Sequence, residues 1–160
     1  MANRMQFAST ERVWGAVDSR FGKQITDWLE GKVAWVGIPN ERSGTPVRML
    51  DCACGRGLVS KALYPWVDEL HDMDIPAKMV TEYNKAARVQ GLIHEQMHAV
   101  EADLLTPADG DTQPLLNSED LSNFDLVLVS MAIHHVHQPE VLLARLADRF
   151  KPGGVVLATE

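Results

Sequence analysis

The segment Val47-Arg-Met-Leu-Asp-Cys-Ala-Cys-Gly-Arg-Gly57 constrains the fold more than any other part of the chain. Its apolar start is typical of a short β-strand that ends on Asp51. Gly55 and Gly57 then allow a tight turn, because glycine adopts left-handed backbone conformations without a steric cost. Residues 58–64 predict a helix that stops before a proline. Backbone N–H groups at the start of this helix point outward, so the turn is suited to a nucleotide-type ligand.

The residues around the glycines are compatible with more than one kind of ligand. Gly55-Arg-Gly-Leu-Val-Ser60 misses the dinucleotide pattern G-x-G-x-x-G by one residue, and such near matches also occur in purely structural turns. Asp51 favours a cationic ligand, because a carboxylate repels a pyrophosphate and attracts an ammonium group. With this acid, the segment resembles the first motif of the class I S-adenosylmethionine-dependent methyltransferases, Asp/Glu-x-Gly-x-Gly-x-Gly. Ala53 stands where the family usually has its first glycine, and we expect it to fit unless the turn requires a positive φ there.

Composition and charge exclude several classes of protein. A length of 160 residues predicts one domain, residues 1–160, with a single buried core. The formal charge of -7 and the lack of a run of Lys and Arg argue against a nucleic-acid partner. No stretch is apolar enough to span a membrane, and the first residues lack the apolar core of a signal peptide. We therefore expect a cytoplasmic protein that does not bind membranes.

Cys52 and Cys54 are the only cysteines. Two cysteines this close together at the end of a strand do not suit a structural disulfide. A zinc site with His134 or His135 would need further ligands at zinc spacing, and the sequence offers no second pair. No metal is predicted.

Residues 1–36 predict an N-terminal helical cap of one or two helices, for which Gly31 is a suitable end. Apolar side chains recur there at helical spacing, at Trp14, Val17, Phe21, Ile25 and Trp28. One interpretation is that the segment folds over cofactor and substrate, as in many small-molecule methyltransferases. The other is that these side chains pack on the core. Residues 37–46 are a connector rich in turn residues, and residues 47–160 form the α/β core.

The second predicted strand, residues 69–74, also ends on an acid, Asp74, and a helix over Pro76–Gln90 follows. Asp74 lies 17 residues beyond Gly57, close to the spacing at which an acid on the second strand hydrogen-bonds a ribose diol. Asp72 is the competing candidate. It lies two residues deeper in the strand, so we favour the terminal Asp74.

In the rest of the chain, predicted strands continue to alternate with predicted helices and loops. Residues 96–102 predict a third strand followed by Asp103, and residues 106–123 a surface excursion with room for one helical turn. Phe124–Ser130 is a continuous apolar run, typical of a strand buried on both faces of a parallel sheet.

A helix then opens at Pro139, and we expect Lys151-Pro-Gly-Gly154 to end it before a fifth strand over residues 155–158. Its inner side is expected to consist of Val141, Leu142, Leu146 and Phe150.

This alternation predicts an α/β fold, a doubly wound parallel sheet with helices on both faces. Ligands of such sheets bind beyond the carboxyl ends of the strands. Asp51, Asp74, Asp103 and Ser130 all fall at predicted strand ends. We therefore expect one ligand site at this edge.

The resemblance to methyltransferases extends over most of residues 47–160. Asp74-Ile-Pro-Ala-Lys-Met79 resembles the second motif of the family, and Phe124–Gly154 resembles the fourth and fifth. The resemblance implies a Rossmann-like fold that binds S-adenosyl-L-methionine, with Asp74 on the ribose and Asp103 on the adenine amino group. The cofactor-binding residues that it implies are Asp51, Ala53, Gly55, Gly57, Asp74, Ile75, Asp103, Leu104 and Ser130.

The principal functional hypothesis is methyl transfer to a small organic acceptor. His134 and His135 follow the fourth strand, where a histidine can act as a general base toward an amine or hydroxyl. Alternatively, they only shape the pocket. A catalytically silent binding subunit and a nicotinamide-dependent oxidoreductase are the alternative functions.

The methyltransferase fold continues after its fifth strand with a further helix and an antiparallel strand pair, and we expect these elements to be missing here. We therefore expect either a fragment of a longer enzyme or a shortened homologue. An apolar strand over residues 155–158 at a sheet edge favours association, so a homodimer or a partner chain is expected to complete the sheet. The chain alone should bind cofactor more readily than it turns over substrate.

Overall fold

The computed structural model describes residues 20–38, 44–106 and 119–159. Five parallel strands form one sheet in the order β3-β2-β1-β4-β5. The strands are β1 (Arg48–Cys52), β2 (Glu69–Asp74), β3 (His98–Glu101), β4 (Phe124–Ser130) and β5 (Phe150–Thr159). The helices are α2 (Arg20–Glu30), α3 (Leu58–Leu63), α4 (Ala77–Val89) and α5 (Pro139–Ala147), with 3-10 helices η1 (Tyr64–Trp66), η3 (Glu119–Leu121) and η4 (Ile133–His135). None of the described helices is long and apolar enough to cross a lipid bilayer.

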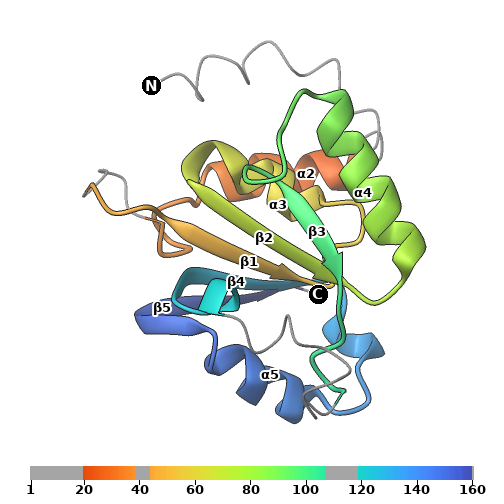
Figure 1. Ribbon diagram of the computed structural model, residues 1–160. Coiled ribbons are helices and arrows are strands. Elements are labelled where there is room, and N and C mark those ends of the chain that lie inside the picture. The colour runs from red at the N-terminus through yellow and green to blue at the C-terminus, as the bar shows by residue number, and fades with distance from the viewer. Residues whose placement is uncertain (1–19, 39–43, 107–118, 160) are drawn as a thin grey trace.

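Helices cover both faces of the sheet. α2, α3 and α4 lie on one face and α5 lies on the other (Figure 1). Alternate strand residues serve the two faces: Met49 and Leu128 belong to the core below α2, α3 and α4, whereas Leu50 and Val127 belong to the core above α5. The strand order reverses next to β1, which is where doubly wound sheets bind ligands. The expected doubly wound α/β fold is confirmed.

β5 begins earlier than expected. Phe150 lies in β5 opposite Phe124, not on the inner side of α5, and the helix has already ended before it. The expectation that Lys151-Pro-Gly-Gly154 ends the helix is therefore wrong. These residues bulge from β5, because the next pair in the register joins Leu126 to Val155. A proline is tolerated here because β5 is an edge strand of the described sheet.

The helix α2 packs on the core through Leu29, which is fully buried, and through the partly buried Ile25. It ends just before Gly31, as expected, and residues 31–37 form turns. Within the described part of the expected cap, residues 20–36, the helix covers only Arg20–Glu30.

Trp28 lies on the outer side of α2. Its side chain is 47% exposed and makes an edge-to-face contact with Trp35, with the ring centroids 5.8 Å apart. Trp28 therefore does not belong to the face that packs on the core. Trp14, Val17 and the side chain of Phe21 lie outside the described residues.

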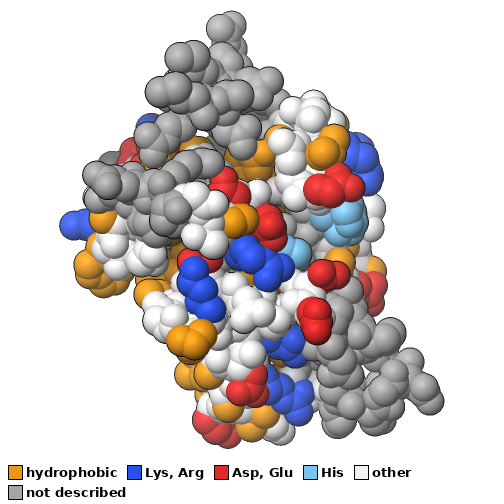
Figure 2. Space-filling view, turned by 60° about the vertical axis from the view of Figure 1, so that its left-hand side comes forward, with side chains coloured by type: hydrophobic (Ala, Val, Ile, Leu, Met, Phe, Trp, Pro, Cys, Tyr) orange, Lys and Arg blue, Asp and Glu red, His pale blue; other side chains and the backbone are white. Residues whose placement is uncertain are grey.

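Opposite charges meet at the amino ends of the strands. Arg48 on β1 pairs with Glu69 on β2 at 2.7 Å, and Lys151 on β5 pairs with Asp125 on β4. Figure 2 turns this side of the sheet forward, and basic and acidic side chains lie next to one another there. Among the described side chains, positive and negative charges are therefore mixed at the amino ends.

Candidate active site at the carboxyl ends of the strands

The glycine turn between β1 and α3 has an unusual backbone. Ala53, Gly55 and Gly57 have φ angles of 63°, 54° and 75°, all in the left-handed region. The turn therefore does require a positive φ at Ala53, so alanine occupies this position only with backbone strain. An L-residue in this conformation costs about 1–2 kcal/mol. The hydrogen bond from Cys54 N to Met73 O, 3.0 Å long, fastens the turn to β2.

The two glycines of the turn have different roles. A Cβ atom on Gly57 would lie 2.3 Å from Cε2 of Tyr83, so only glycine lets α3 start this close to α4. A Cβ atom on Gly55 would meet no described atom within 4 Å. Gly55 thus borders open space, where a ligand can approach the backbone.

Asp74, the last residue of β2, joins the glycine turn to the second strand. Its Oδ2 accepts a hydrogen bond of 2.5 Å from Gly55 N, and its Oδ1 accepts one of 2.8 Å from Ile75 N. Each carboxylate oxygen retains a lone pair for a further donor. Asp72 differs, because hydroxyls of Ser60 and Tyr83 enclose its two oxygens. This geometry favours Asp74 over Asp72 as the acid that a ligand can reach.

Asp51 lies one residue before the end of β1 and is only 1% exposed. Its Oδ2 accepts a hydrogen bond of 2.5 Å from Ser60 Oγ, whereas its Oδ1 has no hydrogen-bond partner among the described residues. Burial raises the pKa of Asp51 to about 7, the Ser60 hydroxyl acts in the opposite direction, and Asp74 adds to the rise. A positive group near Oδ1 would therefore be favourable.

The thiols of Cys52 and Cys54 are buried and free. Burial, together with the neighbouring carboxylates, raises the pKa of Cys52 to about 12 and raises the pKa of Cys54 further above its usual range. Neither thiol is a ready thiolate at neutral pH. The described residues include no group of three or more His, Cys, Asp or Glu arranged to hold a metal ion.

Asp103 lies next to the end of β2, because Ala102 N donates to Asp74 O at 3.0 Å. The Asp103 carboxylate accepts from Leu105 N at 2.8 Å and from Thr106 Oγ1 at 3.1 Å. The neighbouring Leu104 side chain is buried, and Arg145 on α5 donates to the carbonyl of Leu104. The loop after β3 is thus held in place by β2 and by α5.

Ser130 and the two histidines lie at the end of β4. Ser130 Oγ lies 2.8 Å from Thr159 Oγ1 at the end of β5. His134 and His135 are exposed in η4, with their ring centroids 4.0 Å apart. The sheet order brings the ends of β1, β2 and β4 to one edge, together with the loop after β3. The assignment of cofactor and catalytic roles to these residues remains a prediction.

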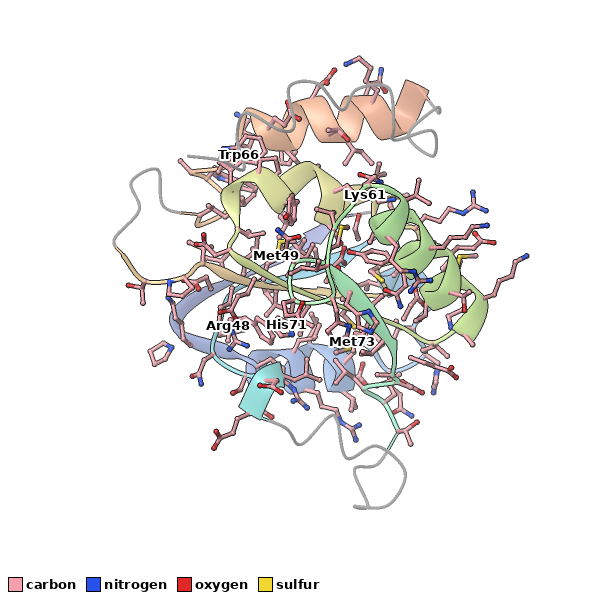
Figure 3. The ribbon with its side chains drawn as sticks, turned by 45° about the horizontal axis from the view of Figure 1, so that its top comes forward. Arg48, Met49, Lys61, Trp66, His71 and Met73 are labelled. Carbon is pink, nitrogen blue, oxygen red and sulfur yellow. The ribbon has the colours of Figure 1, made fainter. Side chains whose placement is uncertain are left out.

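Three polar residues of this region were not anticipated as a group. Ser60 and Tyr83 bind the buried carboxyls, and Lys61, which lies between α3 and α4 in Figure 3, donates to Arg56 O at 2.6 Å. Burial lowers the pKa of Lys61. A signal existed in the sequence, because Ser60 and Lys61 interrupt an otherwise apolar short helix.

Comparisons with known proteins agree on one family. The profile of the methyltransferase domain matches residues 50–158. An uncharacterised methyltransferase of Schizosaccharomyces pombe is 32% identical over 114 residues, which are 71% of this chain and 38% of that protein. A ubiquinone biosynthesis O-methyltransferase of Maricaulis maris is 27% identical over 121 residues, 76% of this chain and 43% of that protein. The chain thus spans about two fifths of these relatives.

Solved structures share the fold. An S-adenosylmethionine-dependent methyltransferase from Clostridium acetobutylicum superposes with a TM-score of 0.63 at 18% identity, over 98% of this chain and 56% of that chain. A coclaurine N-methyltransferase bound to N-methylheliamine and SAH gives a TM-score of 0.64 at 14% identity, over 86% of this chain and 35% of that chain.

Proposed function

This chain belongs to the class I S-adenosylmethionine-dependent methyltransferase family, and on that premise we propose that it binds S-adenosyl-L-methionine and transfers the methyl group to a small organic acceptor. The observation that carries the proposal is the bond of 2.5 Å between Gly55 N and Asp74 Oδ2. It places the expected ribose acid against the glycine turn, next to the open space at Gly55.

The proposed cofactor contacts follow the strand ends. Asp74 receives the ribose hydroxyls through the lone pairs that Gly55 N and Ile75 N leave free. Asp103 accepts from the adenine amino group, and Leu104 lies beside it. Asp51 supplies negative charge for the cationic part of the cofactor.

The sulfonium of the cofactor supplies the methyl group, so the protein must align the acceptor and remove its proton. We propose His134 or His135 as the group that accepts this proton, because both are exposed on η4 at the end of β4. If they only shape the pocket, substitution of both should change the KM of the acceptor more than kcat.

The names of two similar proteins support a proposal about the chemical class of the acceptor. Ubiquinone biosynthesis O-methyltransferases by name modify oxygen, and coclaurine N-methyltransferase modifies nitrogen. We propose a small molecule with a hydroxyl or amine, and an acceptor panel should contain both. The alternative of a silent binding subunit predicts cofactor binding without turnover on this panel.

We further propose that another strand, from a second copy or a partner chain, pairs with β5. β5 is the edge of the described sheet, and Val156 on it is 39% exposed. Light scattering after size exclusion measures the mass of the species in solution.

Titration calorimetry with S-adenosylhomocysteine and, separately, with NADH tests the proposed cofactor. We expect saturable binding of S-adenosylhomocysteine and none of NADH. Binding of NADH alone would contradict the proposal. Transfer of a labelled methyl group to the acceptor panel then tests the activity.

A further inference from the structure

Four buried side chains from four elements form a continuous chain of close contacts beside the glycine turn. Ser60 Oγ on α3 lies 2.5 Å from Asp51 Oδ2 on β1 and 2.6 Å from Asp72 Oδ1 on β2. Tyr83 Oη on α4 lies 2.5 Å from Asp72 Oδ2. All four residues are at most 2% exposed.

The number of hydrogen atoms in this chain sets its protonation. Each hydroxyl donates one hydrogen, so Ser60 and Tyr83 supply two for three oxygen–oxygen contacts. If both carboxyls were ionised, one Ser60 contact would bring lone pairs together without a hydrogen between them. Burial makes such a contact costly, because little water screens the repulsion. One proton on a carboxyl removes the conflict.

We infer that Asp51 and Asp72 share one proton through Ser60, and that a cationic ligand beside Asp51 fixes this proton on Asp72, so that Asp51 is ionised when the cofactor is bound. In this arrangement Asp72 donates to Ser60, Ser60 donates to Asp51, and Tyr83 donates to Asp72. Every short contact then has its hydrogen. Asp72 is a positioning residue, which acts through Ser60 on the charge of Asp51. The role beside the cofactor rests on the proposed function, whereas the shared proton does not.

The charged groups packed around the pair agree with one retained proton. Burial and the charge of Asp51 raise the pKa of Asp72 well above its ordinary value, although Ser60, Tyr83 and Lys61 act in the opposite direction. The carboxylate of Asp74 on β2 adds a further negative charge near Asp51, and the neighbouring thiols of Cys52 and Cys54 are neutral. Lys61 on α3 is the cation that faces Asp72.

In the free protein the hydrogen bonds favour the charge on Asp72, because hydroxyls contact both of its oxygens, whereas Asp51 Oδ1 has no hydrogen-bond partner within the described ranges. A positive group of a ligand beside Asp51 Oδ1 makes Asp51 the better place for the charge. An ionised Asp51 thus keeps one oxygen for a positive group of a ligand. A charge on Asp72 would lie on β2, and Ser60 would separate it from a positive group beside Asp51.

Two isosteric variants separate these roles. In Asp72→Asn, the amide donates to Ser60 and accepts from Tyr83, which reproduces the protonated acid with the charge on Asp51. In Asp51→Asn, the amide donates to Ser60, which donates to an ionised Asp72. Both variants carry one negative charge and satisfy every contact, so they differ only in where that charge lies.

The first measurement is stability against pH, by urea unfolding between pH 5 and pH 7. The folded pair keeps a proton that the unfolded carboxyls lose near pH 4, so wild-type stability falls as the pH rises through this window. Relative to Asp72→Asn, the unfolding constant of the wild type should rise by up to about tenfold for each pH unit. A ratio that stays constant from pH 5 to pH 7 would overturn the shared proton.

An infrared spectrum of the wild type in heavy water at pH 7 gives a test that does not need a folded variant. We expect a carboxylic-acid C=O stretching band, because at this pH exposed carboxylates do not contribute one. Absence of the band would overturn the inference, whatever the variants do.

The second measurement is the dissociation constant of S-adenosylmethionine at pH 7. Asp72→Asn, in which the charge is already on Asp51, should bind at least as tightly as the wild type, whereas Asp51→Asn should bind at least tenfold more weakly. Equal weakening by both variants would overturn the assignment of the charge to Asp51. The wild type could fail to bind the cofactor while the ratio of the unfolding constants changes with pH as expected and the infrared band is present. In that case the proposed function fails and the shared proton stands.

Discussion

At the amino ends of the strands, basic and acidic side chains form ion pairs, whereas Asp51, Asp72 and Asp74 at the carboxyl ends form none with another described residue. Arg48, which lies close to His71 in Figure 3, pairs with Glu69 and also donates to the carbonyls of Asp120 and Ser122. At the carboxyl ends, no ion pair between described residues reaches Asp51, Asp72 or Asp74. The difference supports the proposal that the amino ends stabilise the fold and that the carboxyl ends bind the ligand.

The two ends also differ in how charge is controlled. Burial and the nearby Arg48 lower the pKa of His71, so the histidine stays neutral while Arg48 carries the charge at the amino end. At the carboxyl end, burial raises the pKa of Asp51 and Asp72. A carboxylate in an ion pair stays ionised because its partner neutralises the charge. Buried carboxyls without such a partner are favoured when one of them keeps a proton or when a cation binds beside them.

The largest expected effect comes from Gly57 at the carboxyl end. Gly57→Ala should lower the free energy of unfolding by about 2–4 kcal/mol, because it adds a strained φ and a clash with Tyr83. Tyr83 cannot easily move aside, since Asp72 holds its hydroxyl. The control is Gly55→Ala, which has the strained φ without a clash and should cost about 1 kcal/mol. Equal losses in urea unfolding would contradict the close packing at Gly57.

At the amino end, Arg48→Met should lower the free energy of unfolding by about 1–3 kcal/mol, because it leaves partly buried acceptors without their donor. It should leave the dissociation constant of S-adenosylhomocysteine unchanged. The control is Arg56→Met, which removes an exposed ion pair with Glu82 and should change stability by less than about 1 kcal/mol. A cofactor affinity that depends on Arg48 would break the division between the two ends.

At the carboxyl end, Asp74→Ala should weaken cofactor binding by about 1–3 kcal/mol while the protein stays folded, because it removes a charge-assisted hydrogen-bond acceptor. Calorimetry gives the dissociation constant, and circular dichroism checks the fold. A folded variant with unchanged affinity would remove the ribose role from Asp74.

The smallest effect concerns Ala53. Ala53→Gly should raise the free energy of unfolding by about 0.5–1 kcal/mol, because relief of the left-handed strain exceeds the extra entropy of glycine in the unfolded chain. Thermal unfolding with and without S-adenosylhomocysteine measures it. A less stable variant would mean that the methyl group of Ala53 makes contacts that outweigh its strain.

Much of the fold could be predicted from the sequence. β2 and β4 have the expected bounds, because acids or turn residues limit each apolar run. The bulge at Lys151-Pro-Gly-Gly154 could not be predicted. Proline and glycine also end helices, and only the pairing of β5 with β4 shows that the strand has already begun.

The candidate site was predictable at its strand ends but not in its interior. Acids at the ends of strands are visible in the sequence, since the parallel sheet gathers them at one edge. The chain from Asp51 to Tyr83 was not visible, because Ser60 and Tyr83 come from helices whose facing depends on tertiary packing. The conformation of Ala53 was also hidden, because alanine does not report its φ angle.

The most direct test of the division between the two ends is the chemical-shift change of backbone amides when S-adenosylhomocysteine saturates the labelled protein. We predict the largest changes at Gly55, Ile75 and Leu104, at the carboxyl ends of the strands. The amides of Arg48 and Glu69, at the amino ends, should not change. Changes centred on the amino ends, or spread without preference between the two ends, would contradict the assignment of the ligand site.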